Sequence, residues 1–221
     1  MRIFLIRHGE SINNTGQNYK KRLPDHLVSL TENGIKQAQK GGIWLKNFCI
    51  ENNIDISKSN TRIWRSPYLR TRQTVDEFNK SLKISDIKED ITLAEQQFGL
   101  FDAMSKNEWK EKFPIEFEEY QRQRKNNGKF YARLPMGESP FDVAIRIHQF
   151  MGTIQRDYDK YSIDTLFIFT HGTVLRCFLM RWFHYTPEWY QDEKNPKNCW
   201  IRYIDEDENK KTRDNGYIYS K

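Results

Sequence analysis

The chain has 221 residues, of which 30 % are charged and 37 % hydrophobic, so it is long enough to bury one sizeable core. No apolar run approaches the ~20 residues that a membrane-spanning helix needs, and we expect no membrane association. The net charge of +6 would suit nucleic acid, but the lysines are scattered and no RNA- or DNA-binding motif is present, so we expect no nucleic-acid partner.

Cysteine usage and the N-terminus indicate where the chain works. Cys49, Cys177 and Cys199 are odd in number and widely spaced, and they form neither a disulfide pattern nor a metal-binding one. Met1 leads directly into the first expected strand and leaves no room for a secretory signal. We therefore expect a cytoplasmic protein with no metal site.

Two apolar runs of the sequence end in a His-Gly pair. The first covers residues 3–6 and is followed by Arg7 and His8, and the second covers 165–170 and is followed by His171. Short apolar runs bounded by turn signals predict buried strands. Ligands of open α/β sheets bind beyond the carboxyl ends of such strands. If the two strands are neighbours, the two imidazoles will lie side by side.

The residues around the first histidine resemble the signature of the histidine phosphatase superfamily, the phosphoglycerate-mutase-like proteins. Residues 7–11 read Arg-His-Gly-Glu-Ser, and Asn14 follows three residues later. The resemblance extends from Arg2 to about Tyr203, because several separate motifs recur in the family's order. It implies an α/β fold, a three-layer α/β/α sandwich with a mostly parallel central sheet, and we expect a single domain over 1–221.

A narrower resemblance points to a branch of plant and fungal phosphoglycerate-mutase-like proteins. It rests on Tyr19, on Pro-Asp-His at 24–26, on Phe-Tyr at 130–131 and on Arg-Trp-Phe at 181–183. This match is less specific than the motifs around the histidines.

The segment after the first strand contains the family's next elements. We expect a helix from Thr31, its N-cap, to about Asn52. A second strand over 61–65 is expected to end at Ser66, which we interpret as the N-cap of another helix. Arg70, near the start of that helix, corresponds to the family's phosphate-binding arginine.

Two acidic residues follow in family-like contexts. A strand over 87–93 is expected to lead to Glu95, which precedes an aromatic-Gly pair like that of the family's acid-base element. Glu138 opens a helix capped by Ser139. Two interpretations of Glu138 stay open: it supports the pocket arginines or a histidine from behind, or it is an exposed first-turn glutamate.

The stretch of about 100–135 is predicted to be a helical insertion. It contains a capping box at Ser105, and we expect helices over about 106–112 and 115–126 on either side of Pro114. These helices are rich in charged and aromatic residues. We interpret the insertion as a lid over the active crevice.

The resemblance implies a phosphate site built on arginines. Guanidinium groups are always charged, and their planar fork matches phosphate oxygens, so Arg7 and Arg70 would hold the phosphoryl group. Ser11, Asn14 and Gly172 are the other predicted phosphate-binding residues.

The same resemblance implies a covalent mechanism. His8 is the expected nucleophile, because a neutral imidazole carries a free lone pair at neutral pH. His171 would stabilise the transferring oxygens, and Glu95 would protonate the leaving oxygen and then activate water. We expect neither a metal nor another cofactor.

The sequence therefore predicts an acid-type histidine phosphatase that hydrolyses a small phosphorylated substrate through a phosphohistidine on His8. Two alternatives stay open. One is a phosphoglycerate mutase, although the family's mutases usually carry an arginine where this chain has Gln96. The other is a phospholigand-binding module that turns over weakly. A homodimer is also an open interpretation, and the sequence does not identify the substrate.

Overall fold

A computed structural model describes residues 1–16, 23–57, 59–206 and 211–219; Tyr19, on which the narrower resemblance partly rests, lies outside these ranges. The strands are β1 (Arg2–Arg7), β2 (Thr61–Arg65), β3 (Ile87–Glu89), β4 (Thr165–Thr170), β5 (Ile201–Glu206) and β6 (Thr212–Tyr219). The α-helices are α2 (Glu32–Glu51), α3 (Leu69–Leu82), α4 (Lys106–Lys112), α5 (Pro114–Tyr131), α6 (Pro140–Tyr161), α7 (Gly172–Trp182) and α8 (Pro187–Asp192). Short 3-10 helices are η1 (Asp25–Leu27), η2 (Ile91–Leu93) and η3 (Gly99–Phe101).

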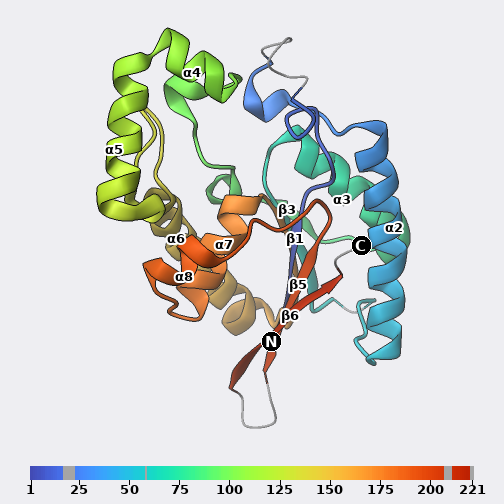
Figure 1. The fold of residues 1–221 in the computed structure, drawn as a ribbon. Coiled ribbons are helices and arrows are strands. Elements are labelled where there is room, and N and C mark those ends of the chain that lie inside the picture. The colour runs from blue at the N-terminus through green and yellow to red at the C-terminus, as the bar shows by residue number, and fades with distance from the viewer. Residues whose placement is uncertain (17–22, 58, 207–210, 220–221) are drawn as a thin grey trace.

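The strands form one six-stranded sheet in the order β3-β2-β4-β1-β5-β6, with helices on both faces (Figure 1). Strands β3, β2, β4 and β1 run parallel to one another, whereas β5 pairs antiparallel with β1 and β6 antiparallel with β5. The predicted three-layer sandwich with a mostly parallel sheet is therefore confirmed.

Alternation along the strands divides the core between the two faces of the sheet. On β1, Phe4 and Ile6 pack with residues of α2 and α3, while Ile3 and Leu5 pack with residues of α6 and α7. Successive strand side chains point to opposite faces, so one apolar run fills both cores. Burial on both faces explains why β1 and β4 are continuously apolar in sequence.

Three expected boundaries differ from the structure. Ser66 does not cap α3, because the helix begins at Leu69 after Tyr68, and the hydroxyl of Ser66 bonds elsewhere. The strand expected over 87–93 ends at Glu89, after which Asp90 caps the 3-10 turn η2. Helix α5 continues to Tyr131 across a break at Gly128, whose φ of 78° is a left-handed value that glycine adopts readily.

The insertion has an apolar cluster of its own. Phe101, Trp109 and Leu134 are buried together, and the rings of Phe101 and Trp109 stack with centroids 4.4 Å apart. The insertion therefore packs on itself beside the main core. In Figure 1 it lies at the end of the molecule that is marked by α4.

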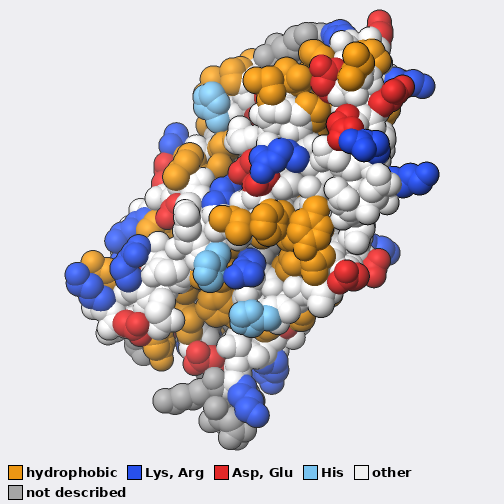
Figure 2. All heavy atoms as spheres, turned by 90° about the vertical axis from the view of Figure 1, so that its left-hand side faces the viewer, with side chains coloured by type: hydrophobic (Ala, Val, Ile, Leu, Met, Phe, Trp, Pro, Cys, Tyr) orange, Lys and Arg blue, Asp and Glu red, His pale blue; other side chains and the backbone are white. Residues whose placement is uncertain are grey.

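The outer surface of α5 and α6 faces the viewer in Figure 2, where apolar side chains are interspersed with charged ones. Exposed large apolar residues on these two helices are Ile115, Tyr131, Phe141, Ile145, Tyr158 and Tyr161. Across the described ranges, no helix has the length and apolar character needed to cross a membrane. The homodimer stays a prediction.

The close contact between the loop after β1 and the first turn of α2 gives a stability prediction. A Cβ at Gly34 would lie 2.0 Å from the carbonyl oxygen of Glu10, so Gly34→Ala forces backbone to move. We expect a loss of about 1–3 kcal/mol or more in the free energy of unfolding, measured in guanidinium chloride. Gly152→Ala on α6 is the matched control, because nothing lies within 4 Å of its Cβ position and it should gain ~0.5–1 kcal/mol. Equal midpoints for the two variants would contradict this account.

Candidate active site

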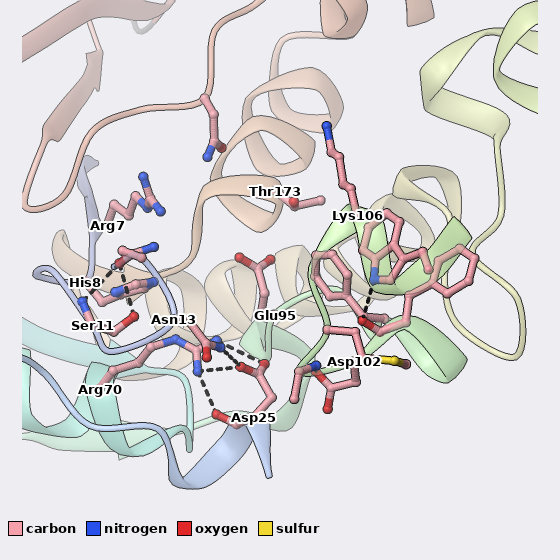
Figure 3. Close-up of a pocket in the computed structure, with 17 residues that line it drawn as sticks. Arg7, His8, Ser11, Asn13, Asp25, Arg70, Glu95, Asp102, Lys106 and Thr173 are labelled. Carbon is pink, nitrogen blue, oxygen red and sulfur yellow. Dashed lines mark hydrogen bonds and ion pairs between the residues drawn. The ribbon is translucent and has the colours of Figure 1, made fainter. Parts of the chain in front are cut away.

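A cavity of about 360 Å³ opens at the edge of the sheet where β1, β2 and β4 end (Figure 3). Six of the predicted site residues line it: Arg7, His8, Ser11, Asn14, Arg70 and Glu95. His171 is fully buried behind His8, and the centroids of the two rings are 5.1 Å apart. Gly172 follows as the first residue of α7. The predicted residues are thus brought together from four separate parts of the chain.

His8 is held in one tautomer. Its Nδ1 lies 2.7 Å from the carbonyl oxygen of Gly9, and because a carbonyl only accepts, Nδ1 carries the proton. Burial, followed by the positive charges of Arg70 and Arg7, holds the pKa of His8 well below its usual value. The ring is therefore neutral near pH 7, with the lone pair on Nε2.

His171 is neutral for the same reasons, since burial and then Arg70 lower its pKa well below the usual value. Its Nε2 lies 2.9 Å from Oγ of Ser66 and 3.4 Å from Oγ1 of Thr71. We assign the tautomer in which both hydroxyls donate to Nε2 and the proton is on Nδ1, although a hydroxyl can also accept. Nδ1 is buried and finds no partner in the described part of the chain. His171 thus holds an unused donor beside His8.

Arg70 is tied to a carboxylate that the sequence did not single out. Its Nη1 and Nη2 donate to the two carboxylate oxygens of Asp25 at 3.0 and 3.1 Å, and Nη1 also donates to the Asp25 carbonyl at 2.7 Å. The guanidinium lies over the ring of Tyr68, 4.9 Å from its centroid. Asp25 lies in the wall of the cavity beside Arg70 (Figure 3). An anion that binds Arg70 must share it with Asp25.

Arg7 comes from the end of β1, and its Nη1 donates to the carbonyl of Pro196 at 2.5 Å. Its Nε is buried without a hydrogen-bond partner within the described ranges. A buried guanidinium with an unused N–H donor is suited to bind an anionic ligand.

Ser11 and Asn14 bond to each other at the cavity wall. Oδ1 of Asn14 accepts from the backbone N–H of Ser11 at 3.0 Å, from its hydroxyl at 3.1 Å and from Nδ2 of Asn198 at 3.0 Å. These bonds fix the amide orientation of Asn14 and leave its Nδ2 donor for a ligand. The hydroxyl of Ser11, in contrast, is already used within the loop.

Glu95 stands in the wall of the cavity with its carboxylate inside it (Figure 3). Burial raises its pKa above the ordinary value, and the negative charge of Asp25 adds to the shift, against the opposing effects of the Gln96 N–H and Arg70. Oε1 accepts from the N–H of Gln96 at 2.9 Å. A carboxyl group that keeps its proton toward neutral pH can act as a general acid.

Glu138 does not contact the pocket arginines or either histidine, so the supporting role considered for it is wrong in that form. Its carboxylate pairs instead with Arg146, at 2.9 and 3.0 Å, and accepts from the N–H of Gln97 at 2.9 Å. It is also not an exposed glutamate. Both residues lie behind the loop that carries Glu95.

The insertion supplies the outer wall of the cavity. Phe101, Met104 and Trp109 contribute apolar surface, and Asp102 and Lys106 add one charge of each sign. Gly172 lies against Asn195, whose Oδ1 would be 2.2 Å from a Cβ at that position. In the described part of the chain, no group of three or more His, Cys, Asp or Glu residues is arranged to hold a metal ion.

Several residues at the site were missed from the sequence. Asp25 and Asn195 line the cavity, Ser66 bonds His171, and Asn198 bonds Asn14 and the carbonyl of His8 at 3.1 Å. Asp25 carried a signal in the Pro-Asp-His stretch of the narrower resemblance, and Ser66 carried one that we interpreted as a helix cap. The remaining residues act through long-range contacts that no local sequence pattern predicts.

Comparisons with known proteins confirm the resemblance predicted from the motifs. A family model described as "Histidine phosphatase superfamily (branch 1)" matches residues 3–214. Phosphoglycerate mutase-like protein AT74 of Arabidopsis thaliana is 32% identical over 214 residues, which cover 92% of this chain and 64% of that protein. The chain thus spans less than two thirds of that relative's length.

Two further proteins are similar to the chain. Broad-range acid phosphatase DET1 of Saccharomyces cerevisiae is 24% identical over 296 residues, covering 93% of this chain and 85% of that protein. Among solved structures, the alpha-ribazole phosphatase from Shigella flexneri superposes with a TM-score of 0.75 at 20% identity, covering 100% of this chain and 97% of the other. This last likeness supports the fold alone.

The Arg70–Asp25 pair predicts how the cavity binds a small oxyanion. Asp25→Asn removes a negative charge next to Arg70 but keeps an oxygen that can accept from it, so inorganic phosphate should bind about 3- to 10-fold more tightly. Isothermal titration calorimetry of both proteins would measure the change. Weaker binding by the variant would show that Asp25 chiefly orients Arg70, and would contradict the competition described here.

Proposed function

Because the chain belongs to the histidine phosphatase superfamily, we propose that it hydrolyses phosphate monoesters through a phosphohistidine on His8. The observation that carries the proposal is the neutral His8, held by Gly9 with its lone pair on Nε2, in a cavity that also contains Arg7, Arg70 and Glu95. The substrate is a small phosphorylated molecule, and the proposed location is the cytoplasm.

In the first step, Nε2 of His8 attacks phosphorus, an N–P bond forms and the ester P–O bond breaks. Arg7 and Arg70 offset the charge of the phosphoryl group, which otherwise repels a nucleophile. The donor on Nδ1 of His171 is available to the transferring oxygens as their charge grows. Asn14 adds a donor from its Nδ2.

Glu95 serves both steps in turn. Its raised pKa favours the protonated form, which gives its proton to the leaving oxygen. As a carboxylate, it then takes a proton from the water that attacks phospho-His8, so the N–P bond breaks and inorganic phosphate and neutral His8 are released. The cycle closes with Glu95 protonated again. No step needs a metal, since the two arginines supply the positive charge.

The insertion fits this chemistry as a lid. Phe101, Met104 and Trp109 would shield the phosphoryl group from bulk water, and its own apolar cluster lets the insertion move as a unit.

The mutase alternative is less well supported. Gln96, at the position that usually holds arginine in the family's mutases, donates from Nε2 to the carbonyl of Glu138 at 2.7 Å and is buried. The side chain of Gln96 therefore holds the loop, and, being uncharged, it cannot pair with a second acidic group of a substrate as an arginine could. Stimulation of the protein by 2,3-bisphosphoglycerate would favour the mutase instead.

Replacing the nucleophile tests the proposal directly. With p-nitrophenyl phosphate and EDTA present, we expect turnover by the wild type and a loss on the order of 1,000-fold or more in kcat/KM for His8→Ala. His148→Ala is the matched control, because this histidine is exposed on α6 and should not affect the rate. Turnover that EDTA abolishes, or that His8→Ala retains, would refute the mechanism. A single burst without turnover would favour the binding module.

The raised pKa of Glu95 predicts the pH dependence. The acid form is needed to protonate a poor leaving group, so kcat/KM for phenyl phosphate should fall as pH rises through the pKa of Glu95. The Glu95→Gln variant should lose this limb of the profile. For p-nitrophenyl phosphate, whose phenolate leaves without a proton, the limb should be weak in both proteins. A limb that persists in Glu95→Gln would assign the titration to another group.

A further inference from the structure

We propose that Arg146 and Glu138 are positioning residues for Glu95, acting as one ion pair that fixes the loop from which the proton is delivered. The inference rests on the proposed function, because it assigns a task to residues that support the general acid. It adds to the reaction two residues on the far side of that loop from the cavity.

Arg146, on α6, donates hydrogen bonds to the backbone on the N-terminal side of Glu95 and at Glu95 itself. Its Nη1 donates to the carbonyl of Thr92 at 2.5 Å, and its Nη2 donates to the carbonyl of Glu95 at 3.2 Å. Its Nε and Nη2 also pair with both oxygens of Glu138. The guanidinium of Arg146 therefore donates on one side to the backbone of the loop and on the other side to the carboxylate of Glu138.

Glu138 forms hydrogen bonds with the backbone on the C-terminal side of Glu95. Its Oε2 accepts from the N–H of Gln97, and its own N–H donates to the carbonyl of Gln97 at 2.9 Å. The side chain of Gln96 completes the contact by donating to the Glu138 carbonyl. The loop is thus held before, at and after Glu95 by the same pair of charges.

The position of the Glu95 carboxyl depends on this hold. The loop has no helix or strand of its own between η2 and η3. Within the described residues, the only hydrogen bond to the carboxylate comes from the adjacent N–H of Gln96, which moves with the loop. Misplacing a catalytic group by about 1 Å can cost on the order of 100-fold in rate. The position of the Glu95 carboxyl group is therefore set by the hydrogen bonds that fix the backbone of this loop.

Neither member of the pair reaches the substrate. Arg146 and Glu138 do not line the cavity, and their side chains are 18% and 19% exposed. An effect of either residue on the reaction can therefore pass through the loop and Glu95, or through the charge of Arg146, which adds to the effect of burial in lowering the pKa of His171. Arg146→Lys keeps that charge, so it tests the first route.

The experiment compares Arg146→Lys with the wild type on phenyl phosphate and p-nitrophenyl phosphate. Lysine keeps the charge but cannot hold Glu138 and two carbonyls together. We expect kcat/KM for phenyl phosphate, whose leaving group needs a proton, to fall about 10- to 100-fold, and that for p-nitrophenyl phosphate to fall less than about 3-fold. Because kcat/KM reports the step in which the ester bond breaks, the comparison isolates the acid.

A double variant separates positioning from a purely structural role. In the Glu95→Gln background, Arg146→Lys should cause no further loss on phenyl phosphate, since the group that it aims is gone. Additive losses, or equal losses on both substrates, would overturn the assignment. Glu138→Gln provides a second route if Arg146→Lys fails to fold, because it keeps the side-chain size but loses the oxygen that accepts from Gln97.

Arg133→Lys is the matched control, since Arg133 also pairs with a carboxylate of α6, Asp142, but is mostly exposed, and within the described residues its side chain bonds the carbonyl of Gly137 and none of residues 92–97. Its rates on both substrates should equal those of the wild type. A wild type that turns over neither substrate would overturn the proposed function and, with it, this inference. A wild type that turns over both, with the two rates falling together in Arg146→Lys, would overturn the inference alone.

Discussion

The parallel register between β1 and β4 is the constraint on which the site depends. Arg7 is paired with Thr170, so the next residue of each strand is a histidine, and the N–H of His8 donates to the carbonyl of Thr170 at 3.0 Å. A shift of one residue would send one imidazole to the opposite face of the sheet. Both strands are buried on both faces, so their side chains fix this register firmly.

The neighbouring strand extends the same arrangement to a third element. On the other side of β4, β2 places Arg65 opposite Phe169, and the N–H of Ser66 donates to the carbonyl of Phe169 at 3.0 Å. The hydroxyl of Ser66 is thereby placed 2.9 Å from Nε2 of His171. Chemistry at this edge is thus arranged by main-chain pairing, and the loops and the insertion add the groups that surround it.

The sequence was most informative where a local pattern has a single structural outcome. The apolar runs before His8 and His171 predicted buried strands, which the structure has as β1 and β4, and the family motifs pointed to Arg70 and Glu95, which line the cavity. Ser66 was misread because a Ser-Pro pair after a strand has the same local signature as a helix cap. Whether the hydroxyl caps a helix or bonds His171 is decided by packing between β2 and β4, far apart in the chain.

The contacts made by Asp25 and Arg146 were beyond sequence reasoning for a related reason. Asp25 lies in a loop without periodicity, and its partner Arg70 comes from a different helix. Glu138 precedes the N-cap of α6 and Arg146 lies about two turns beyond it, which is outside the three- or four-residue spacing of side chains that meet on a helix, so the spacing does not predict their contact. Nor does it predict the loop that they hold, because the carbonyls of Thr92 and Glu95 have no side-chain signature.

The pairing of Asp25 with Arg70 has a consequence for how a ligand arrives. Seen from beyond a Debye length of roughly 8 Å in physiological salt, the two charges cancel, so Arg70 does little to draw anions from solution. On contact, its N–H groups still act at hydrogen-bond range. Encounter with Arg70 is thus governed by ordinary diffusion, and an anion is held by Arg70 only after it has entered the cavity.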